Sequence, residues 1–232
     1  MRRFCLMTTG RTGSTALMDA IARGADVAVP ARQLVDCRDH ELLHPRMAPG
    51  YARVLGELSG TSIRSHEALI DTFFALNGDR AFAGFKSMPN RHPDFERFTT
   101  REDLCVINLV RRDLVATAAS FLLAMTQGTW RREGGVPAQR LRLDATGRAH
   151  VRDNLRYLRR ALHLLARVPE AIRLDYEDLC SPAFASRELD DFFGRPIRLE
   201  RPLGATRAED YVEDVDAFEA FVLECWAAAE AR

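Results

Sequence analysis

The chain has 232 residues, of which 33 are basic and 33 acidic, and 47% of its residues are hydrophobic. This length is enough for one well-buried domain, and we expect residues 1–232 to form a single domain. The zero net charge gives no reason to expect binding to nucleic acid or to a membrane surface. No apolar run approaches the ~20 residues of a membrane span.

The first ten residues and the cysteines favour a reduced, cytoplasmic protein. MRRFCLMTTG holds too short an apolar run for a signal peptide and no small-residue cleavage site. The five cysteines are scattered and form no CxxC pair. We therefore expect reduced, mostly buried thiols rather than disulfides or a metal site.

The first quarter of the chain predicts a strand, a turn and a helix, followed by a loop. An apolar run over 3–8 leads into a Gly-containing turn, and helical spacing over 14–23 ends at Gly24. A second short strand is expected over 27–29, before a proline. Residues 31–60 show no regular pattern and are predicted to form an elaborated loop.

The rest of the chain alternates strands with helices. LCVINLV is apolar apart from Asn108, which is typical of a central parallel strand buried on both faces. Strands are expected over 80–86, 104–110 and 172–174. Helices are expected over 64–76, 113–125, 148–167, 182–193 and 214–229, with a loop over 127–147. This order predicts a three-layer, P-loop-like α/β fold whose central parallel sheet has about four or five strands flanked by helices.

Three turns are expected to meet at one edge of this sheet. Ligands of open α/β folds bind beyond the carboxyl ends of the parallel strands. That edge would hold the turns at 9–15, 86–90 and 111–113, which together would form one site.

The turn TTGRTGST after the first strand is suited to an anion. Gly10 and Gly13 allow backbone N–H groups to converge before a helix that begins near Ser14. Arg11 adds a permanent positive charge for phosphate oxygens, and Thr15 adds a hydroxyl donor. A tight turn with a capping serine is the alternative interpretation.

The same turn lacks the lysine of a nucleotide-hydrolysing loop, which reads GxxxxGK[ST]. No acidic Mg²⁺-binding motif is evident in the sequence either. We therefore expect the turn to hold the monophosphate end of a nucleotide.

A second anion site is expected after the central strand. Arg112 follows this strand and Ser120 lies eight residues further on, a little over two helical turns, so the two can lie on a similar face. An arginine and a hydroxyl in this arrangement can clamp a second phosphate. Taken alone, pairing of Arg112 with Asp113 or Asp103 is the simpler interpretation.

Together, the two sites resemble those of sulfotransferases that use 3′-phosphoadenosine 5′-phosphosulfate (PAPS). That family has a 5′-phosphosulfate loop after its first strand, in forms such as RSGST, and TGRTGST matches it. Its 3′-phosphate motif is an arginine after a central strand with a serine eight residues later. Arg112 and Ser120 match this spacing without a gap. Arg111 is the weaker alternative, because its spacing to Ser120 is one residue too long. FKSMP (85–89) and DYEDL (175–179) resemble two further segments, so the resemblance runs from residue 4 to about 179. Within that family, the motifs most resemble those of bacterial carbohydrate sulfotransferases of the trehalose-sulfating type.

This resemblance implies transfer of a sulfuryl group from PAPS to a hydroxyl of a carbohydrate-like or small-molecule acceptor, without a metal. It implies that Lys86 reaches the transferred group, that Arg112 and Ser120 hold the 3′-phosphate, and that Arg207 helps near the 3′ end. The 5′-phosphosulfate would be held by Arg11, Thr12, Gly13, Ser14 and Thr15.

The general base does not follow directly from the resemblance. Cytosolic members place a histidine two residues after the lysine, but this chain has Met88 there. The trehalose type uses a glutamate after the first helix, close behind a proline. Glu41 is the only glutamate in that segment, although it lies eleven residues beyond Pro30, and we assign it as the base. The other candidates are His40, His44, Asp36, Asp39 and His66 with Glu67.

Four points stay open at this stage. A P-loop kinase or hydrolase would need GK[ST] and Mg²⁺ ligands, and metal dependence of nucleotide binding would identify it. A non-catalytic homologue would keep the nucleotide pocket but transfer nothing. Residues 130–135 are predicted to be either a lid over the acceptor or an exposed loop, and the sequence does not predict the oligomeric state.

Overall fold

The computed structural model describes residues 1–30, 40–92, 94–128, 140–204 and 207–230. Its centre is a five-stranded sheet in the order β2-β3-β1-β4-β5, and all neighbouring strands are parallel. The strands are β1 (Arg2–Thr8), β2 (Val27–Ala28), β3 (Phe82–Ser87), β4 (Leu104–Val110) and β5 (Ile172–Asp175). The predicted three-layer α/β fold with four or five parallel strands is confirmed.

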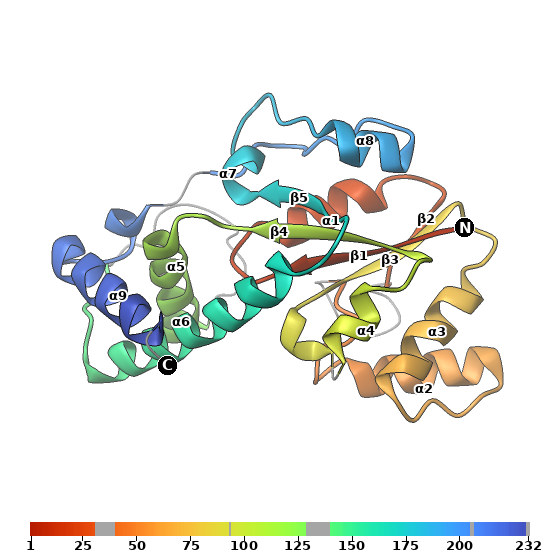
Figure 1. The fold of residues 1–232 in the computed structure, drawn as a ribbon, viewed down its shortest axis with the longest axis horizontal. Coiled ribbons are helices and arrows are strands. Elements are labelled where there is room, and N and C mark those ends of the chain that lie inside the picture. The colour runs from red at the N-terminus through yellow and green to blue at the C-terminus, as the bar shows by residue number, and fades with distance from the viewer. Residues whose placement is uncertain (31–39, 93, 129–139, 205–206, 231–232) are drawn as a thin grey trace.

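Helices cover both faces of the sheet (Figure 1). Side chains alternate along a strand, so Phe4 and Leu6 of β1 point to one face while Cys5 and Met7 point to the other. The first face is covered by α1 (Ser14–Ala22) and α8 (Arg187–Phe193). The second face is covered by α2 (Ala48–Ser59), α3 (His66–Leu76), α4 (Phe95–Thr99) and the end of α6 (Ala145–Ala166).

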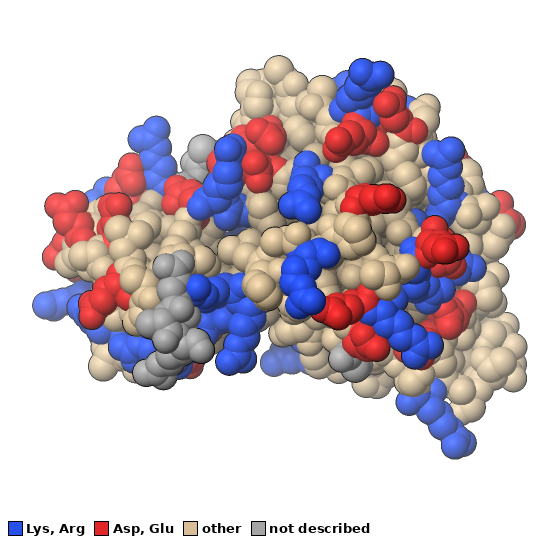
Figure 2. All heavy atoms as spheres, viewed as in Figure 1, with Lys and Arg blue, Asp and Glu red and all other residues tan. Residues whose placement is uncertain are grey.

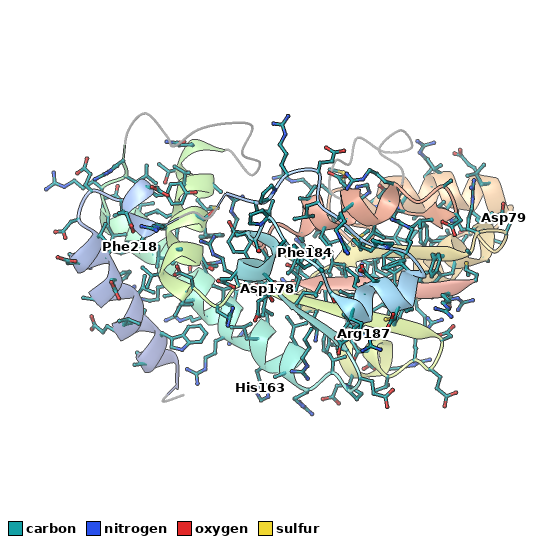
Figure 3. All side chains as sticks on the ribbon, turned by 90° about the horizontal axis from the view of Figure 1, so that it is seen from above. Asp79, His163, Asp178, Phe184, Arg187 and Phe218 are labelled. Atoms are coloured by element: carbon teal, nitrogen blue, oxygen red, sulfur yellow. The ribbon has the colours of Figure 1, made fainter. Side chains whose placement is uncertain are left out.

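A third hydrophobic cluster lies beyond the carboxyl end of the sheet, at the left of Figure 1. It is formed by α5 (Leu114–Gln127), the first part of α6 and α9 (Val215–Glu230). Figure 3 shows the length of the molecule, with Phe218 of this cluster at one end and Asp79 at the other. The remaining short helices are η1 (Pro89–Arg91), α7 (Tyr176–Leu179) and η2 (Ala208–Asp210).

The prediction of a loop over residues 31–60 is wrong for its second half, which forms α2. Pro49 lies in the first helical turn, where its missing N–H costs nothing. Tyr51 and Leu55, one turn apart, are buried against the sheet, and Gly60 ends the helix in the left-handed conformation. Burial of this face stabilises the helix, although its proline and glycines made the sequence look irregular.

Four of the five cysteines are free thiols: Cys5, Cys105, Cys180 and Cys225. Cys37 lies outside the described residues. Burial raises the pKa of the Cys5 thiol well above its ordinary value, so this thiol is unreactive. None of the helices in the described ranges combines the length and the apolarity needed to cross a membrane.

Candidate functional site

The turn after β1 is wound tightly by three residues with positive φ: Gly10 (84°), Arg11 (57°) and Gly13 (69°). Helix α1 then begins at Ser14, as predicted. Gly13 is its N-cap, so no side chain caps the first N–H groups, and the first turn carries no acidic residue. A helix start of this kind has N–H donors and a positive dipole end available for an anion.

Two contacts fix the shape of this turn. The hydroxyl groups of Thr8 and Thr12 are hydrogen-bonded to each other in the interior. On the other side, Gly13 lies against a later segment of the chain, because a Cβ added there would be 2.1 Å from Leu203 Cδ1. That segment is held in turn by the Tyr176 hydroxyl, which donates to the Gly204 carbonyl at 2.9 Å. The phosphate-type turn is therefore covered by residues from a distant part of the sequence.

Arg11 and Ser120, which the sequence assigned to separate anion sites, are in direct contact. Arg11 Nε donates a hydrogen bond to Ser120 Oγ at 2.9 Å, and Ser120 is buried on α5. The first turn and the helix after β4 therefore contribute to a single polar region.

Lys86 and Glu41 form a buried ion pair beside this region. Lys86 Nζ lies 3.3 Å from Glu41 Oε1 and donates to Thr15 Oγ1 at 3.2 Å. The backbone also holds the two residues side by side. Lys86 N–H donates to the His40 carbonyl at 2.9 Å, and Glu41 forms an isolated parallel β-bridge with Lys86. Glu41 Oε2 is buried and has no hydrogen-bond partner among the described residues. This oxygen is a hydrogen-bond acceptor whose capacity is unused within the described part of the chain.

The other candidates for the base are placed differently. His40 Nε2 lies 2.8 Å from Asp19 Oδ1 on α1, and His44 Nδ1 accepts from the Arg46 N–H at 3.2 Å. His66 and Glu67 line a separate pocket of ≈ 490 Å³ between α3 and α4. The remaining candidates, Asp36 and Asp39, lie outside the described residues, as does the 130–135 segment.

The two arginines after β4 have opposite environments. The Arg112 side chain is 64% exposed, and its Nε lies 3.2 Å from Asp175 Oδ2 and 3.7 Å from Glu177 Oε2. Arg111 is buried, with its guanidinium carbon 4.4 Å from the centre of the Tyr176 ring. In the part of the chain that the structure covers, no hydrogen bond links Arg112 to Ser120. The structure thus brings Ser120 to Arg11 and leaves Arg112 beside two carboxylates.

The DYEDL segment supports the 111–113 turn. The Glu177 carboxylate accepts hydrogen bonds from the N–H groups of Arg112 and Asp113, each at 3.1 Å. Burial alone would raise the pKa of Glu177, but these N–H groups and the Arg112 charge outweigh it and hold the pKa below its ordinary value. Glu177 is therefore ionised and fixes the turn from which both arginines project.

Arg207 and Met88 lie at the borders of the site. Arg207 is exposed at the start of η2, 3.5 Å from Glu209, and its N–H donates to Asp210 at 3.0 Å. Met88 lies over the first turn, since a Cβ added at Gly10 would be 3.5 Å from Met88 Cε. A thioether cannot act as a base, so the structure gives Met88 a packing role above the turn.

Sequence reasoning missed two features that the structure brings to the site. The pairing of His40 with Asp19 anchors the segment that carries Glu41, and Tyr176 joins the turn after β4 to the segment that covers Gly13. Neither pairing has a spacing signal, because its partners come from different elements. No group of three His, Cys, Asp or Glu side chains is arranged to hold a metal ion within the described ranges.

Comparison with known proteins adds one structural likeness. No protein-family model matches the chain, and no curated protein matches it. Among solved structures, it is similar to a sulfotransferase domain from the curacin biosynthetic pathway, with 16% identity and a TM-score of 0.48. The likeness covers 94% of this chain and 86% of that one. At this level it does not establish an activity, which has to be argued from the site.

Proposed function

We propose that the chain is a sulfotransferase that moves a sulfuryl group from PAPS to a hydroxyl of a carbohydrate-like or small-molecule acceptor. One observation carries this proposal: a glycine-rich turn without a lysine, a buried Lys86–Glu41 pair and the Arg11–Ser120 contact converge at the carboxyl edge of one parallel sheet. Such a site offers phosphate ligands, a cation for the transferred group and a buried carboxylate oxygen without a partner among the described residues, and it does not require a metal. The trehalose-type acceptor preference belongs to the same proposal.

In this proposal the first turn binds the 5′-phosphosulfate. Arg11 and the backbone from Thr12 to Thr15 stabilise the negative charge that develops on the leaving phosphate. Lys86 neutralises the oxygens of the transferred group. Ser120, hydrogen-bonded to Arg11, lies where it can bind a phosphate oxygen together with that arginine.

Glu41 is proposed as the general base. Lys86 holds Oε1, so Oε2 faces no competing partner among the described residues and can accept the proton of the acceptor hydroxyl. The acceptor oxygen then bonds to sulfur as the sulfur–oxygen bond to the leaving phosphate breaks. The proton ends on Glu41 and the negative charge on the phosphate.

The test of this proposal combines binding with transfer. Calorimetry with adenosine 3′,5′-bisphosphate should show metal-independent binding, and a sulfation screen with labelled PAPS should show transfer to a hydroxyl acceptor. Glu41→Gln keeps the shape of the side chain and should lower kcat about 10²- to 10⁴-fold while leaving bisphosphate affinity within about two-fold. Near-normal turnover of this folded variant would place the base elsewhere.

The 3′-phosphate assignment needs its own comparison, because Arg112 is paired with carboxylates and Arg111 is buried against Tyr176. We propose Arg112, from the sequence, as the residue that distinguishes the bisphosphate from AMP. Arg112→Ala should reduce this preference by at least about tenfold, since a charge-assisted contact to phosphate is worth about 1.5–3 kcal/mol. Unchanged preference in Arg112→Ala, with loss in Arg111→Lys, would transfer the role to Arg111.

A non-catalytic nucleotide-binding homologue is the second candidate function. The observation in its favour is that Lys86 and Glu41 already neutralise each other in the interior. Bisphosphate binding without transfer to any acceptor in the screen would support this candidate over the enzyme.

A further inference from the structure

A pocket of ≈ 450 Å³ lies between η1 and α6, at the edge of the sheet where β3 ends. Its lining residues come from these two elements: Asn90, Asp153, Arg156, Tyr157, Arg160, Ala161 and Leu164. Figure 2 shows the molecule hollowed below α6, with Lys and Arg side chains around the hollow. The pocket contains none of the residues assigned to the nucleotide, so it is a separate part of the surface.

The charge of this pocket is positive. Arg156 Nη1 pairs with Asp153 at 3.1 Å, which neutralises one cation. Arg160 lines the pocket as well, and Arg91 belongs to η1 beside Asn90. Over the described ranges, no carboxylate forms an ion pair with Arg160, so this lining residue leaves one positive charge for a ligand. Arg91 does not line the pocket, but its Nε is buried without a hydrogen-bond acceptor in the described part of the chain, and its charge adds to the positive potential beside the pocket.

Tyr157 supplies a further donor. Its hydroxyl is buried and has no hydrogen-bond partner in the described part of the chain. Burial raises the pKa of Tyr157 to about 12, with the Arg91 charge lowering it and the Glu41 charge raising it. The phenol is thus protonated near neutral pH, and it lies within electrostatic range of both the cation of η1 and the proposed base.

We propose that this pocket binds an anionic group, a carboxylate or a phosphate, carried by the hydroxyl acceptor. This inference rests on the proposed sulfotransferase function, because it assigns the pocket to the acceptor. Arginine donors and a phenol match the oxygens of such a group, while Ala161 and Leu164 provide apolar contact for its carbon skeleton. The pocket is assigned to the acceptor because the Glu41 charge acts on Tyr157, one of the residues that line it.

The experiment compares anionic and neutral probes of the same shape. Calorimetry on the full chain, with and without adenosine 3′,5′-bisphosphate, would use methyl β-glucuronide against methyl β-glucoside, and glucose 6-phosphate against glucose. At least one anionic probe should bind more tightly than its neutral partner. Arg160→Gln should weaken that binding about five-fold, the equivalent of ~1 kcal/mol for one exposed charge.

Arg187→Gln is the matched control. It removes the same charge from α8, on the opposite face of the sheet from the end of α6 (Figure 1), and should leave probe binding unchanged. Equal binding of anionic and neutral probes, or equal losses in the two variants, would overturn the inference. Bisphosphate binding is measured in the same samples. Its absence would reject the sulfotransferase proposal and with it the acceptor role, whereas charge-selective probe binding would show that the pocket itself recognises anions.

Discussion

Glu41 and Lys86 are two opposite charges buried at the site, and each makes the other tolerable in the interior. Side-chain exposure is 7% for Glu41 and 5% for Lys86, so either charge left alone would lack both water and a partner. Removing one partner of a buried ion pair typically costs about 3–5 kcal/mol, while replacing both can be nearly neutral. Single and double substitutions can therefore distinguish the contribution of the pair to stability from its proposed role in catalysis.

The first prediction follows from that asymmetry. Lys86→Met should lower the free energy of unfolding by about 3 kcal/mol, because the Glu41 carboxylate is left unpaired. Adding Glu41→Gln to this variant should restore most of the loss, but should not restore sulfuryl transfer. Urea unfolding and the transfer assay together check this. A double variant no more stable than Lys86→Met would mean that the pair is not the source of the cost.

His92 predicts a dependence of stability on pH. Burial, followed by the charge of His66, lowers the pKa of His92 from 6.5 to about 3, and its Nε2 lies 2.9 Å from Ser87 Oγ. Between these two pKa values the unfolded chain binds a proton that the folded protein does not, so stability falls as pH falls through this window. From pH 7.5 to 5.5 the loss due to His92 should be about 1.4 kcal/mol, because the ratio of the unfolded-state proton-binding terms changes tenfold over this range.

His92→Gln is the variant that measures this contribution. It removes the titrating group and keeps a polar side chain beside Ser87, so its stability should fall less steeply between pH 7.5 and 5.5 than that of the unaltered chain. The slopes are compared by urea unfolding at each pH, independently of any constant loss from the stacking of His92 on Phe98. Parallel slopes would show that His92 titrates normally.

At the scale of elements, Gly13 in the turn after β1 can be compared with Gly60, which ends α2 as an ordinary helix C-cap. Gly13 has φ 69° and would bring a Cβ to 2.1 Å from Leu203, whereas Gly60 has φ 67° and nothing within 4 Å. An alanine at either position would be strained by roughly 1–2 kcal/mol because of the positive φ. Only at Gly13 would its Cβ also displace the segment that carries Leu203.

This pair of glycines gives the third prediction. Gly60→Ala should lower the free energy of unfolding by about 1 kcal/mol and leave bisphosphate affinity unchanged. Gly13→Ala should be less stable than Gly60→Ala and should also weaken bisphosphate binding by at least about tenfold, because Leu203 must move away from the turn. If both variants bind the bisphosphate normally, the turn is not the phosphate site.

The strands and the first turn could be predicted from the sequence because their signals are local. The run LCVINLV and the glycines of TTGRTGST lie within a few residues of each other, and the structure contains β4 and a tightly wound turn there. Helix α2 could not be predicted in this way, since Pro49 and the neighbouring glycines conceal a helix that burial of Tyr51 and Leu55 stabilises. The short helix α4 was not predicted either, because its five residues are too few to show helical spacing.

The arrangement of the site was less accessible to sequence reasoning. Spacing suggested that Ser120 acts with Arg112, but the structure places its hydroxyl on Arg11, and it pairs Arg112 with Asp175 and Glu177. Such pairings are set by how β1, β4 and β5 lie next to one another, and not by distance along the chain. The assignment of Arg112 therefore stays a prediction for the binding experiment.

At the scale of the whole molecule, α6 joins the sheet to the cluster beyond its end. Leu155, near the middle of this helix, is buried with α5 and α9, whereas Leu165 is buried beneath the sheet. A continuous helix of 22 residues transmits the loss of packing at one end to the other. This continuity supports the proposal that residues 1–232 form one domain that unfolds cooperatively.

The last prediction tests that cooperativity with the two leucines. Leu155→Ala and Leu165→Ala should each lower the free energy of unfolding by about 2–5 kcal/mol, the usual cost of a leucine-sized cavity. In a Trp130→Phe background, Trp226 reports on the cluster of α5, α6 and α9, and far-ultraviolet circular dichroism reports on the whole chain. The two signals should change at the same urea concentration in both variants. An earlier fluorescence transition confined to Leu155→Ala would show instead that the cluster unfolds by itself, and the chain would then contain two units joined through α6.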